Sequence, residues 1–426
     1  MKKAALHSLG CKVNSYETEA MQQMLEQAGY EIVPFSEKAD LYVINTCSVT
    51  NIADRKSRQM IHKARKMNPD AIVVAAGCYV QTSAEQARND SSIDIVIGNN
   101  KKQDLLKMID TYEKEHRAEE GILDINMSGQ PYEELKVNHP AEHTRAFLKV
   151  QDGCNQFCSY CIIPYARGRV RSRKPEDVVA ETKELAKNGF QEVVLTGIHL
   201  SSYGMDLGCS LMDLIRSIHQ IEGIRRIRLG SLEPGIITKE FVEELVTLKK
   251  VCPHFHLSLQ SGSGAVLKRM NRKYTPDEYL EKCRILREYY EHPAITTDVI
   301  VGFPGETEEE FVQTCEFVKK AAFYEIHVFK YSRRNGTVAA GMPDQIPESI
   351  KGQRSSVLMK IADDLKEEFV CWYEGKQVEV LFEEPVIRDG VQYYEGFTPE
   401  YVKVWHASDE NLGNRIMEVE FFRILY

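Results

Sequence analysis

Strand-like and helix-like stretches alternate along this chain, and that alternation restricts the fold more than any other feature. Between residues 145 and 346, six apolar strand candidates follow one another with helical segments between them. A parallel connection needs a crossover, usually a helix, so this order predicts parallel strands. Six such units favour a partly closed (β/α)6 barrel. The six stretches are "AFLKVQDG", "FQEVVLTGIHL", "RRIRLGSLE", "HFHLSLQSG", "AITTDVIVGFPG" and "EIHVFKYS".

The N-terminal part shows the same alternation and is expected to be a separate domain over residues 1–110. Its apolar stretches "KKAALHSLG", "LYVINTCSV", "AIVVAAGCYV" and "IDIVIGNN" predict an open parallel α/β sheet. A first helix is expected from Ser15 to Ala28, because Asn14 and Glu17 have the spacing of a capping box and Gly29 provides a stop.

The other segments have different patterns. Residues 111–144 are polar and acidic, which predicts a linker or an irregular wrap, and residues 347–374 predict a connecting helix. In residues 375–426, short strands are separated by turn signals such as Asp389-Gly390, which predicts a small antiparallel β-barrel or sandwich. The whole chain is therefore expected to be an α/β protein with three domains.

Three cysteines follow the first barrel strand in the pattern C-x3-C-x2-C, at Cys154, Cys158 and Cys161. Structural zinc normally has four protein ligands, whereas three thiolates on a 4Fe4S cluster leave one iron open to an exogenous ligand. The spacing favours the iron-sulfur cluster, with a zinc site completed by a distant histidine or cysteine as the alternative. At the carboxyl ends of barrel strands, such a cluster is placed for chemistry.

Three further cysteines, Cys11, Cys47 and Cys78, each come at or just after the end of a predicted N-terminal strand. The carboxyl ends of parallel strands share one edge of a sheet, so these thiols are expected to converge there. Leu9-Gly10-Cys11 also imitates a lipoprotein signal, but the apolar segment before it is short and interrupted by His7. We therefore expect Cys11 to be a cluster ligand.

Composition limits the classes of function. A net charge of -9 argues against a surface that binds nucleic acid everywhere and requires a local basic patch instead. No stretch approaches the roughly eighteen apolar residues of a membrane span, so no membrane contact and a cytoplasmic location are expected. Eleven cysteines in a reducing compartment favour metal or redox chemistry over disulfides.

These motifs resemble the methylthiotransferase family of radical S-adenosylmethionine enzymes over nearly the whole chain. The barrel motif matches at Cys154, Cys158 and Cys161, and "LGCKVNSYE", "NTCSVT" and "AGCYVQ" match the family's second set of cluster ligands. The C-terminal strands match the RNA-binding TRAM module in position and size. Within the family, "GCKVN" and "DGCNQFCSYCIIPYARGRVRSR" look most like the bacterial branch that modifies N6-threonylcarbamoyladenosine at position 37 of tRNA.

The resemblance implies two 4Fe4S clusters, S-adenosylmethionine, a tRNA substrate and an external electron donor. One S-adenosylmethionine would methylate sulfur held at the N-terminal cluster. A second would be cleaved at the barrel cluster to a 5′-deoxyadenosyl radical that takes hydrogen from adenine C2, where the methylthio group is added. Because cofactors carry this chemistry, no catalytic side chain is assigned. The alternatives are the branch acting on isopentenyladenosine-37 of tRNA and a non-catalytic iron-sulfur or zinc protein that binds RNA.

Residues at the ends of barrel strands are the candidates for S-adenosylmethionine binding, although the same residue types serve turns and caps in any barrel. The candidates are Thr196, Gly197, Ser231, Glu233, Gln260, Ser261, Asp298 and Gly302.

For tRNA, "YARGRVRSRK" offers alternate cations that would project from one face of an extended chain and bind phosphates; the alternative is a solvated strand edge. These cations are Arg167, Arg169, Arg171, Arg173 and Lys174, with Lys268, Arg269, Arg272, Lys273, Arg333 and Arg334 as secondary candidates. The TRAM-like segment 376–426 holds five Lys or Arg and ten Asp or Glu, a net of -5, which disfavours phosphate binding.

Overall fold

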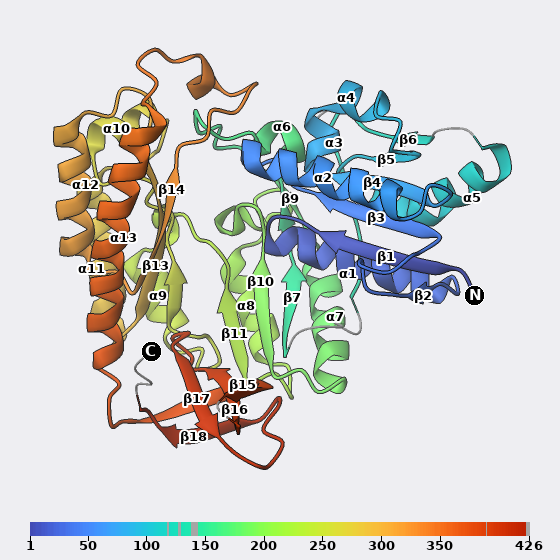
Figure 1. Ribbon diagram of the computed structural model, residues 1–426. Coiled ribbons are helices and arrows are strands. Elements are labelled where there is room, and N and C mark those ends of the chain that lie inside the picture. The colour runs from blue at the N-terminus through green and yellow to red at the C-terminus, as the bar shows by residue number, and fades with distance from the viewer. Residues whose placement is uncertain (117–118, 127–128, 138–143, 389, 423–426) are drawn as a thin grey trace.

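The computed structural model describes residues 1–116, 119–126, 129–137, 144–388 and 390–422. Its N-terminal domain and its barrel lie side by side, and the C-terminal sheet lies beneath the barrel (Figure 1). Among the described residues, no helix has both the length and the apolar character needed to cross a bilayer. Asp389 and parts of the expected linker 111–144 lie outside the described residues.

The N-terminal domain is an open sheet of parallel strands in the order β2-β1-β3-β4-β5-β6. Apolar residues such as Ala5, Val43 and Val74 are fully buried in it, which explains the unbroken apolar strand sequences. The strands are β1 (Lys3–Ser8), β2 (Glu31–Ile32), β3 (Leu41–Thr46), β4 (Ile72–Gly77), β5 (Ile95–Ile97) and β6 (Glu119–Gly121). The helices are α1 (Lys12–Gln27), α2 (Asn51–Met67), α3 (Cys78–Thr82), α4 (Ala84–Arg88), the 3-10 turn η1 (Lys102–Asp104) and α5 (Leu105–Glu115).

Two expectations for this domain are wrong. The sheet continues past residue 110, because the short edge strand β6 has an acidic sequence with no apolar pattern to announce it. The helix α1 begins at Lys12, and its N-cap residue Cys11 makes no side-chain cap. Asn14 and Glu17 are both buried inside the helix, where they bind other parts of the protein instead of forming a capping box.

The barrel strands are hydrogen-bonded in sequence order, as expected for a partly closed barrel. β7-β10-β11 and β12-β13-β14 are parallel sheets, joined by the parallel bridges Ile227–Val251 and Leu232–Leu257. The strands are β7 (Arg145–Lys149), β10 (Glu192–Thr196), β11 (Arg226–Leu229), β12 (His254–His256), β13 (Ala294–Val301) and β14 (Glu325–Lys330).

Helices cover the outer face of the barrel (Figure 1). They are α7 (Pro175–Lys187), α8 (Leu211–His219), α9 (Lys239–Leu245), α10 (Gly264–Arg269), α11 (Pro276–Tyr289), α12 (Glu308–Ala321) and α13 (Glu348–Cys371). Short elements occupy its loops: β8 (Gln151–Asp152), α6 (Ile163–Arg167), β9 (Arg171–Ser172), η2 (Leu200–Ser202), η3 (Pro234–Ile236) and η4 (Val338–Gly341).

The C-terminal domain is a curled antiparallel sheet in the order β17-β16-β15-β18, with a bulge between Phe382 and Pro385. Its strands are β15 (Gln377–Arg388), β16 (Val391–Phe397), β17 (Lys403–Ala407) and β18 (Ile416–Glu420). The sheet contacts the amino-terminal ends of β7 and β11, the end of the barrel opposite the loops that carry Cys154, Cys158 and Cys161 (Figure 1).

Arginines of the barrel hold the C-terminal sheet in place. Arg228 Nη1 donates to the carbonyl oxygen of Pro399 at 2.8 Å, and its Nε donates to Glu192 at 2.8 Å. The guanidinium of Arg145 lies over the rings of Phe397 and Tyr401, at 4.9 and 4.8 Å from their centroids. Phe397 and Tyr401 of this sheet therefore pack against the barrel.

The buried Arg228–Glu192 pair makes the acid stability of the protein depend on Glu192. Burial raises the pKa of Glu192, but Arg228 outweighs burial and holds the pKa below its usual range. A depressed folded pKa means that the pair stabilises the protein above about pH 4.3 and loses this contribution as the pH falls further.

We expect Glu192→Gln to lower the free energy of unfolding by about 3 kcal/mol at pH 7, because a buried guanidinium loses its counter-charge. The difference from the unsubstituted protein should shrink as the pH falls below about 4. Urea unfolding across this range measures both. Glu325→Gln, which removes the exposed Lys366–Glu325 pair, is the control and should change little. A difference for Glu192→Gln that stays constant with pH would contradict this assignment.

Candidate functional site

Cys11, Cys47 and Cys78 lie at the carboxyl ends of three neighbouring strands, β1, β3 and β4. Cys47 and Cys78 follow directly on β3 and β4, whereas Cys11 comes after a turn at Gly10. Gly10 has a φ of +103°, and a methyl group on it would lie only 2.7 Å from the Sγ of Cys47. A glycine is therefore required here, because it lets the loop of Cys11 close onto Cys47.

The side chain of Asn14 ties this edge of the sheet together. Its Nδ2 donates to the carbonyl oxygens of Leu9, at 2.7 Å, and Thr46, at 2.9 Å. These residues precede the loops of Cys11 and Cys47. Asn14 thus holds the loops of Cys11 and Cys47 next to each other. It can do so because α1 begins at Lys12, which puts Asn14 in the first turn of the helix.

Cys154, Cys158 and Cys161 lie in the loop between β8 and α6, and all three are partly exposed. The loop is folded back on itself: the amide of Cys154 donates to Gly168 and that of Cys161 to Cys158. Gly153 has a φ of +72°, and a methyl group on it would lie 1.9 Å from the carbonyl oxygen of Arg169. The second cysteine set therefore also depends on a glycine for its tight turn.

Polar hydrogens already point at the sulfur atoms of both sets. The Nη1 of Arg272 lies 3.2 Å from the Sγ of Cys158, the amide of Gln156 lies 3.4 Å from Cys154, and the Nδ2 of Asn99 lies 3.5 Å from Cys78. Hydrogen-bond donors of this kind surround the thiolate ligands of iron-sulfur clusters. Burial raises the pKa of Cys47 and Cys154 to about 11 and that of Cys161 to about 12. Only a strong local cation such as a metal would ionise them at neutral pH.

A buried ion cluster joins the N-terminal domain to the barrel between the two cysteine sets. Arg167 of the barrel loop donates to Glu17 at 2.9 Å, to Asp152 at 3.1 Å and to the Oδ1 of Asn14 at 2.6 Å. Lys149 of β7 lies 2.7 Å from Glu17 and 2.8 Å from Asp152. Burial raises the pKa of Glu17, but Arg167 and two lysines outweigh it and hold the pKa well below the usual range.

Each cysteine loop of the N-terminal domain has its own contact with the barrel. Near Cys11 the contact is Asn14–Arg167. Beside Cys47, Ser48 accepts a hydrogen bond from the Nη2 of Arg334 at 2.7 Å. Near Cys78, Asn99 donates to the carbonyl oxygen of Ala166 at 2.8 Å. The relative position of the two cysteine sets is thus determined by the domain interface.

Comparisons with known proteins agree with this arrangement. Residues 148–318 match the Radical SAM superfamily model, and residues 3–98 match the model of Uncharacterized protein family UPF0004. The chain is 43% identical to the Threonylcarbamoyladenosine tRNA methylthiotransferase MtaB of Bacillus subtilis, over 100% of this chain and 95% of the relative. The chain belongs to the radical S-adenosylmethionine methylthiotransferase family. This confirms the resemblance that the cysteine motifs predicted.

Other members are related at similar levels. The Aquifex aeolicus protein of the same name is 43% identical over 89% of this chain and 92% of its own. A tRNA-2-methylthio-N(6)-dimethylallyladenosine synthase of Thermoanaerobacter sp. is 39% identical over 97% of this chain and 89% of its own. Among solved structures, the radical S-adenosylmethionine methyltransferase TsrM of Kitasatospora setae shares the fold, with a TM-score of 0.55 at 16% identity over 78% of this chain and 72% of its own.

In this methylthiotransferase the row of arginines expected to bind RNA is mostly buried. Arg167, Arg171 and Arg173 are at most 3% exposed, and Arg173 pairs with Glu181 at 2.5 Å. The expectation that they form a surface row is wrong, because the segment after Cys161 runs between the domains instead of along an open edge. Arg169 and Lys174 are exposed and stay candidates. Of the secondary candidates Lys268, Lys273 and Arg333 are exposed, whereas Arg269, Arg272 and Arg334 are paired with carboxylates.

The residues predicted to bind S-adenosylmethionine fall into two groups. Ser231 is exposed, and Glu233 and Asp298 are partly exposed, whereas Gln260 is buried with a φ of +73°. The other four candidates are packed against neighbouring parts of the protein. Thr196 is buried, the Ser261 hydroxyl lies 3.2 Å from that of Thr314 on α12, Gly197 lies against Gln151, and Gly302 lies against Lys351. The hydroxyl of Ser261 is therefore engaged with α12.

The sequence did not single out Arg272 and His199 as partners of Glu233. Arg272 binds Glu233 at 2.8 Å while it also contacts Cys158. His199 Nε2 lies 3.6 Å from Glu233 and 3.5 Å from Gln156, which lies between two cysteines of the loop. These residues come from four different barrel loops, so no sequence spacing connects them.

A cleft of about 870 Å³ opens between the loops that follow the two cysteine sets. Asn51 and Asp54 line it shortly after Cys47, and Ile162 and Tyr165 line it shortly after Cys161. Tyr165 is 40% exposed at its surface. The cleft is therefore lined by residues of both domains that follow Cys47 and Cys161 in the chain.

The ion cluster makes a testable contribution to stability. We expect Arg167→Met to lower the free energy of unfolding by about 3–5 kcal/mol, because Glu17 and Asp152 would remain buried without their guanidinium. Urea unfolding followed by circular dichroism measures this. Arg169→Met, two residues away on an exposed side chain, is the matched control and should change little. Equal effects of the two substitutions would show that the cluster does not bind the domains together.

Proposed function

We propose that this protein transfers a methylthio group to C2 of N6-threonylcarbamoyladenosine at position 37 of tRNA, with two 4Fe4S clusters and S-adenosylmethionine. The observation that carries the proposal is the 43% identity to enzymes named for this reaction over the full chain. The two cysteine sets on either side of one domain interface support it, because the reaction needs a radical source and a sulfur carrier close together.

The cysteines fit the two clusters. Cys154, Cys158 and Cys161 would hold one cluster in the barrel, and Cys11, Cys47 and Cys78 the other. The first would supply electrons for S-adenosylmethionine cleavage, and the second would hold the sulfur that is transferred. In the ion cluster the cations outnumber the carboxylates with which they pair. Lys102, Lys149, Arg167 and Arg171 pair with Glu17 and Asp152. This excess positive charge beside Cys11 and Cys78 suits anionic thiolates.

The side chains around the barrel loop position the cofactor and exclude water. Arg272 donates to Cys158 and holds Glu233, whose carboxylate can accept hydrogen bonds from ribose hydroxyls or the ammonium of S-adenosylmethionine. The Nε2 of His199 lies 3.6 Å from the same carboxylate. Ser231, Glu233 and Gln260 stay candidates for contacts with S-adenosylmethionine, whereas Asp298 pairs with His256.

The tRNA would enter by the cleft between the loops that follow the two cysteine sets. The exposed cations Arg169, Lys174, Lys268, Lys273 and Arg333 would bind its phosphates. The guanidinium of Arg169 lies 4.6 Å from the ring centroid of Phe157, inside the cysteine loop. An external electron donor has to reduce the barrel cluster.

The second candidate function is methylthiolation of the isopentenyl-type nucleoside, because a dimethylallyladenosine synthase is 39% identical over nearly the whole chain. The two substrates differ chemically: the threonylcarbamoyl group carries a carboxylate, whereas the dimethylallyl group is apolar.

Substitution of each cysteine set should have a different effect. We expect Cys154→Ala/Cys158→Ala/Cys161→Ala to retain one cluster and to lose cleavage of S-adenosylmethionine, because the open iron is gone. Cys11→Ala/Cys47→Ala/Cys78→Ala should also retain one cluster but still form 5′-deoxyadenosine without methylthiolation. Anaerobic iron and sulfide analysis measures the number of clusters, and chromatography measures 5′-deoxyadenosine and the methylthiolated nucleoside. Cys315→Ala, on α12, is the control and should keep both clusters. Stoichiometric zinc without S-adenosylmethionine cleavage would contradict the enzymatic proposal.

The substrate can be tested directly with defined tRNAs. We expect the reconstituted protein to methylthiolate tRNA that carries N6-threonylcarbamoyladenosine at least a hundredfold faster than tRNA that carries isopentenyladenosine. The reason is that a site built for a polar group rejects an analogue without it by large factors, about 10⁴ in favourable cases. Mass spectrometry of the digested nucleosides measures both products. Preference for isopentenyladenosine would place the chain in the second branch.

A further inference from the structure

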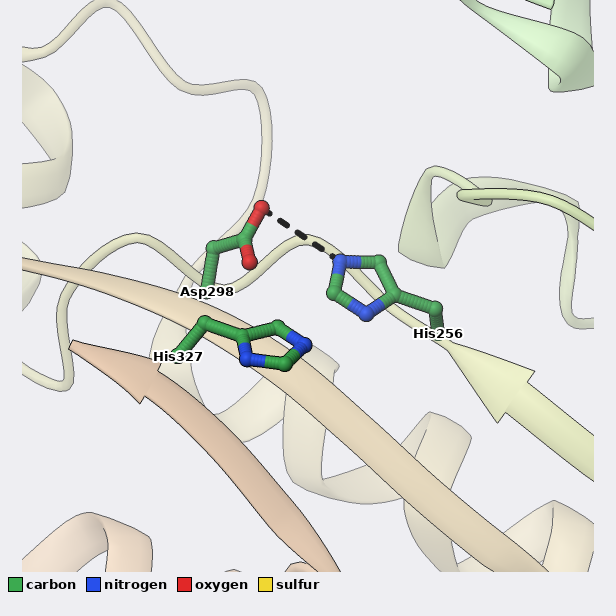
Figure 2. A group of neighbouring side chains, drawn as sticks. All are labelled: His256, Asp298 and His327. Atoms are coloured by element: carbon green, nitrogen blue, oxygen red, sulfur yellow. Dashed lines mark ion pairs between the residues drawn. The ribbon is translucent and has the colours of Figure 1, made fainter. Parts of the chain in front are cut away.

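Three side chains on adjacent barrel strands converge apart from the cysteine sets. They are His256 at the end of β12, Asp298 on β13 and His327 on β14 (Figure 2). The strand register accounts for this, because Asp298 lies opposite His327 and His256 lies opposite Thr296, two residues before Asp298. Residues two apart on a strand point to the same face, so all three side chains lie on one face of the sheet.

The three side chains form a compact set of metal-binding atoms. One ligand atom from each lies within 4.8 Å of the other two. The Nε2 of His256 lies 3.4 Å from the Oδ2 of Asp298, and the two imidazole rings are stacked with centroids 6.0 Å apart. Two imidazoles and one carboxylate are a ligand set for Zn²⁺ and related transition-metal ions, with coordination positions left open.

The orientation of His256 is fixed as in a metal ligand. Its Nδ1 lies 3.0 Å from the hydroxyl of Thr296, a side chain that is only 2% exposed. Metal-binding histidines normally donate their other ring N–H to such an oxygen, which leaves the free nitrogen for the metal. In this arrangement Nε2 is the free nitrogen, and it faces Asp298 (Figure 2).

A simple ion pair explains this arrangement less well. The separation of 3.4 Å between His256 and Asp298 exceeds the roughly 2.7–2.9 Å of a charge-assisted hydrogen bond. His327 has no hydrogen-bond partner among the residues that the structure describes, although its ring lies beside this pair. A shared cation accounts for all three side chains at once.

We propose that His256, Asp298 and His327 bind a divalent transition-metal ion of the zinc class in the barrel, separate from the two iron-sulfur clusters. Three protein ligands leave at least one position open, and a carboxylate is a suitable ligand for it. The threonylcarbamoyl group carries a carboxylate, so the open position would take this part of the substrate. This second step rests on the proposed function, whereas the metal site itself does not.

Zinc binding tests the site independently of activity. We expect the protein with both clusters loaded, after equilibrium dialysis against micromolar Zn²⁺, to bind one Zn²⁺ per chain more than His327→Asn or His256→Gln. Elemental mass spectrometry measures the zinc, while iron and sulfide analysis confirms the clusters. Thr296→Val should weaken zinc binding about tenfold, because it removes only the partner of His256.

The control is His62→Asn, which removes a histidine that lies 2.8 Å from Asp90 at the surface without a second imidazole. It should bind as much zinc as the unsubstituted protein. Because His327 is exposed, its substitution should preserve the fold and both clusters. Equal zinc in the unsubstituted protein and in His327→Asn, or an equal loss in His62→Asn, would overturn the site.

The substrate role has a separate measurement. We expect His327→Asn, but not the control His62→Asn, to raise the KM for tRNA carrying threonylcarbamoyladenosine about tenfold. An unchanged KM would overturn the role of the metal in substrate binding. Zinc binding in a protein that does not methylthiolate this nucleoside would sustain the metal site and refute the proposed function, so the two failures can be told apart.

Discussion

The buried ion cluster around Arg167 is the interaction on which the arrangement of the whole active region depends. It joins Asn14 and Glu17 of the N-terminal domain to Asp152 and Lys149 of the barrel, and all of these side chains are almost inaccessible to solvent. Buried charges are stable only when they are paired, and here Glu17 of the N-terminal domain pairs with cations of the barrel. Because Asn14 also holds the loops of Cys11 and Cys47, the same contact sets the position of the N-terminal cysteine set.

The two ends of the barrel have different binding partners in this arrangement. The carboxyl ends of the barrel strands receive the N-terminal domain and carry Cys154, Cys158 and Cys161. The amino-terminal ends bind the C-terminal sheet through Arg145, Arg226 and Arg228. The acidic sheet is therefore anchored by cations of the barrel. Its rings at Phe397 and Tyr401 are engaged in that contact, which leaves less of the sheet for RNA.

The cysteine sets were predictable because each is tied to a local pattern. C-x3-C-x2-C places three thiols in one loop, and Cys11, Cys47 and Cys78 recur at the ends of parallel strands, which share an edge in any such sheet. The arginines were not predictable in this way. An alternating row such as Arg169, Arg171 and Arg173 looks the same on a surface and in an interface, and the carboxylate that neutralises Arg173 lies on α7. The proposed metal ligands His256, Asp298 and His327 were not predictable either, because they come from three different strands.

The sequence by itself determined the order of parallel strands, the places where thiols follow them and the family, since these depend on local periodicity and short motifs. Only the tertiary structure decided which cations face solvent, that Asn14 and Glu17 hold two domains together instead of capping a helix, and that Glu233 is held by Arg272 and His199. The physical reason is the same in each case. Whether a charged side chain is buried, and with what it pairs, depends on residues far away in the chain, which a local pattern does not specify.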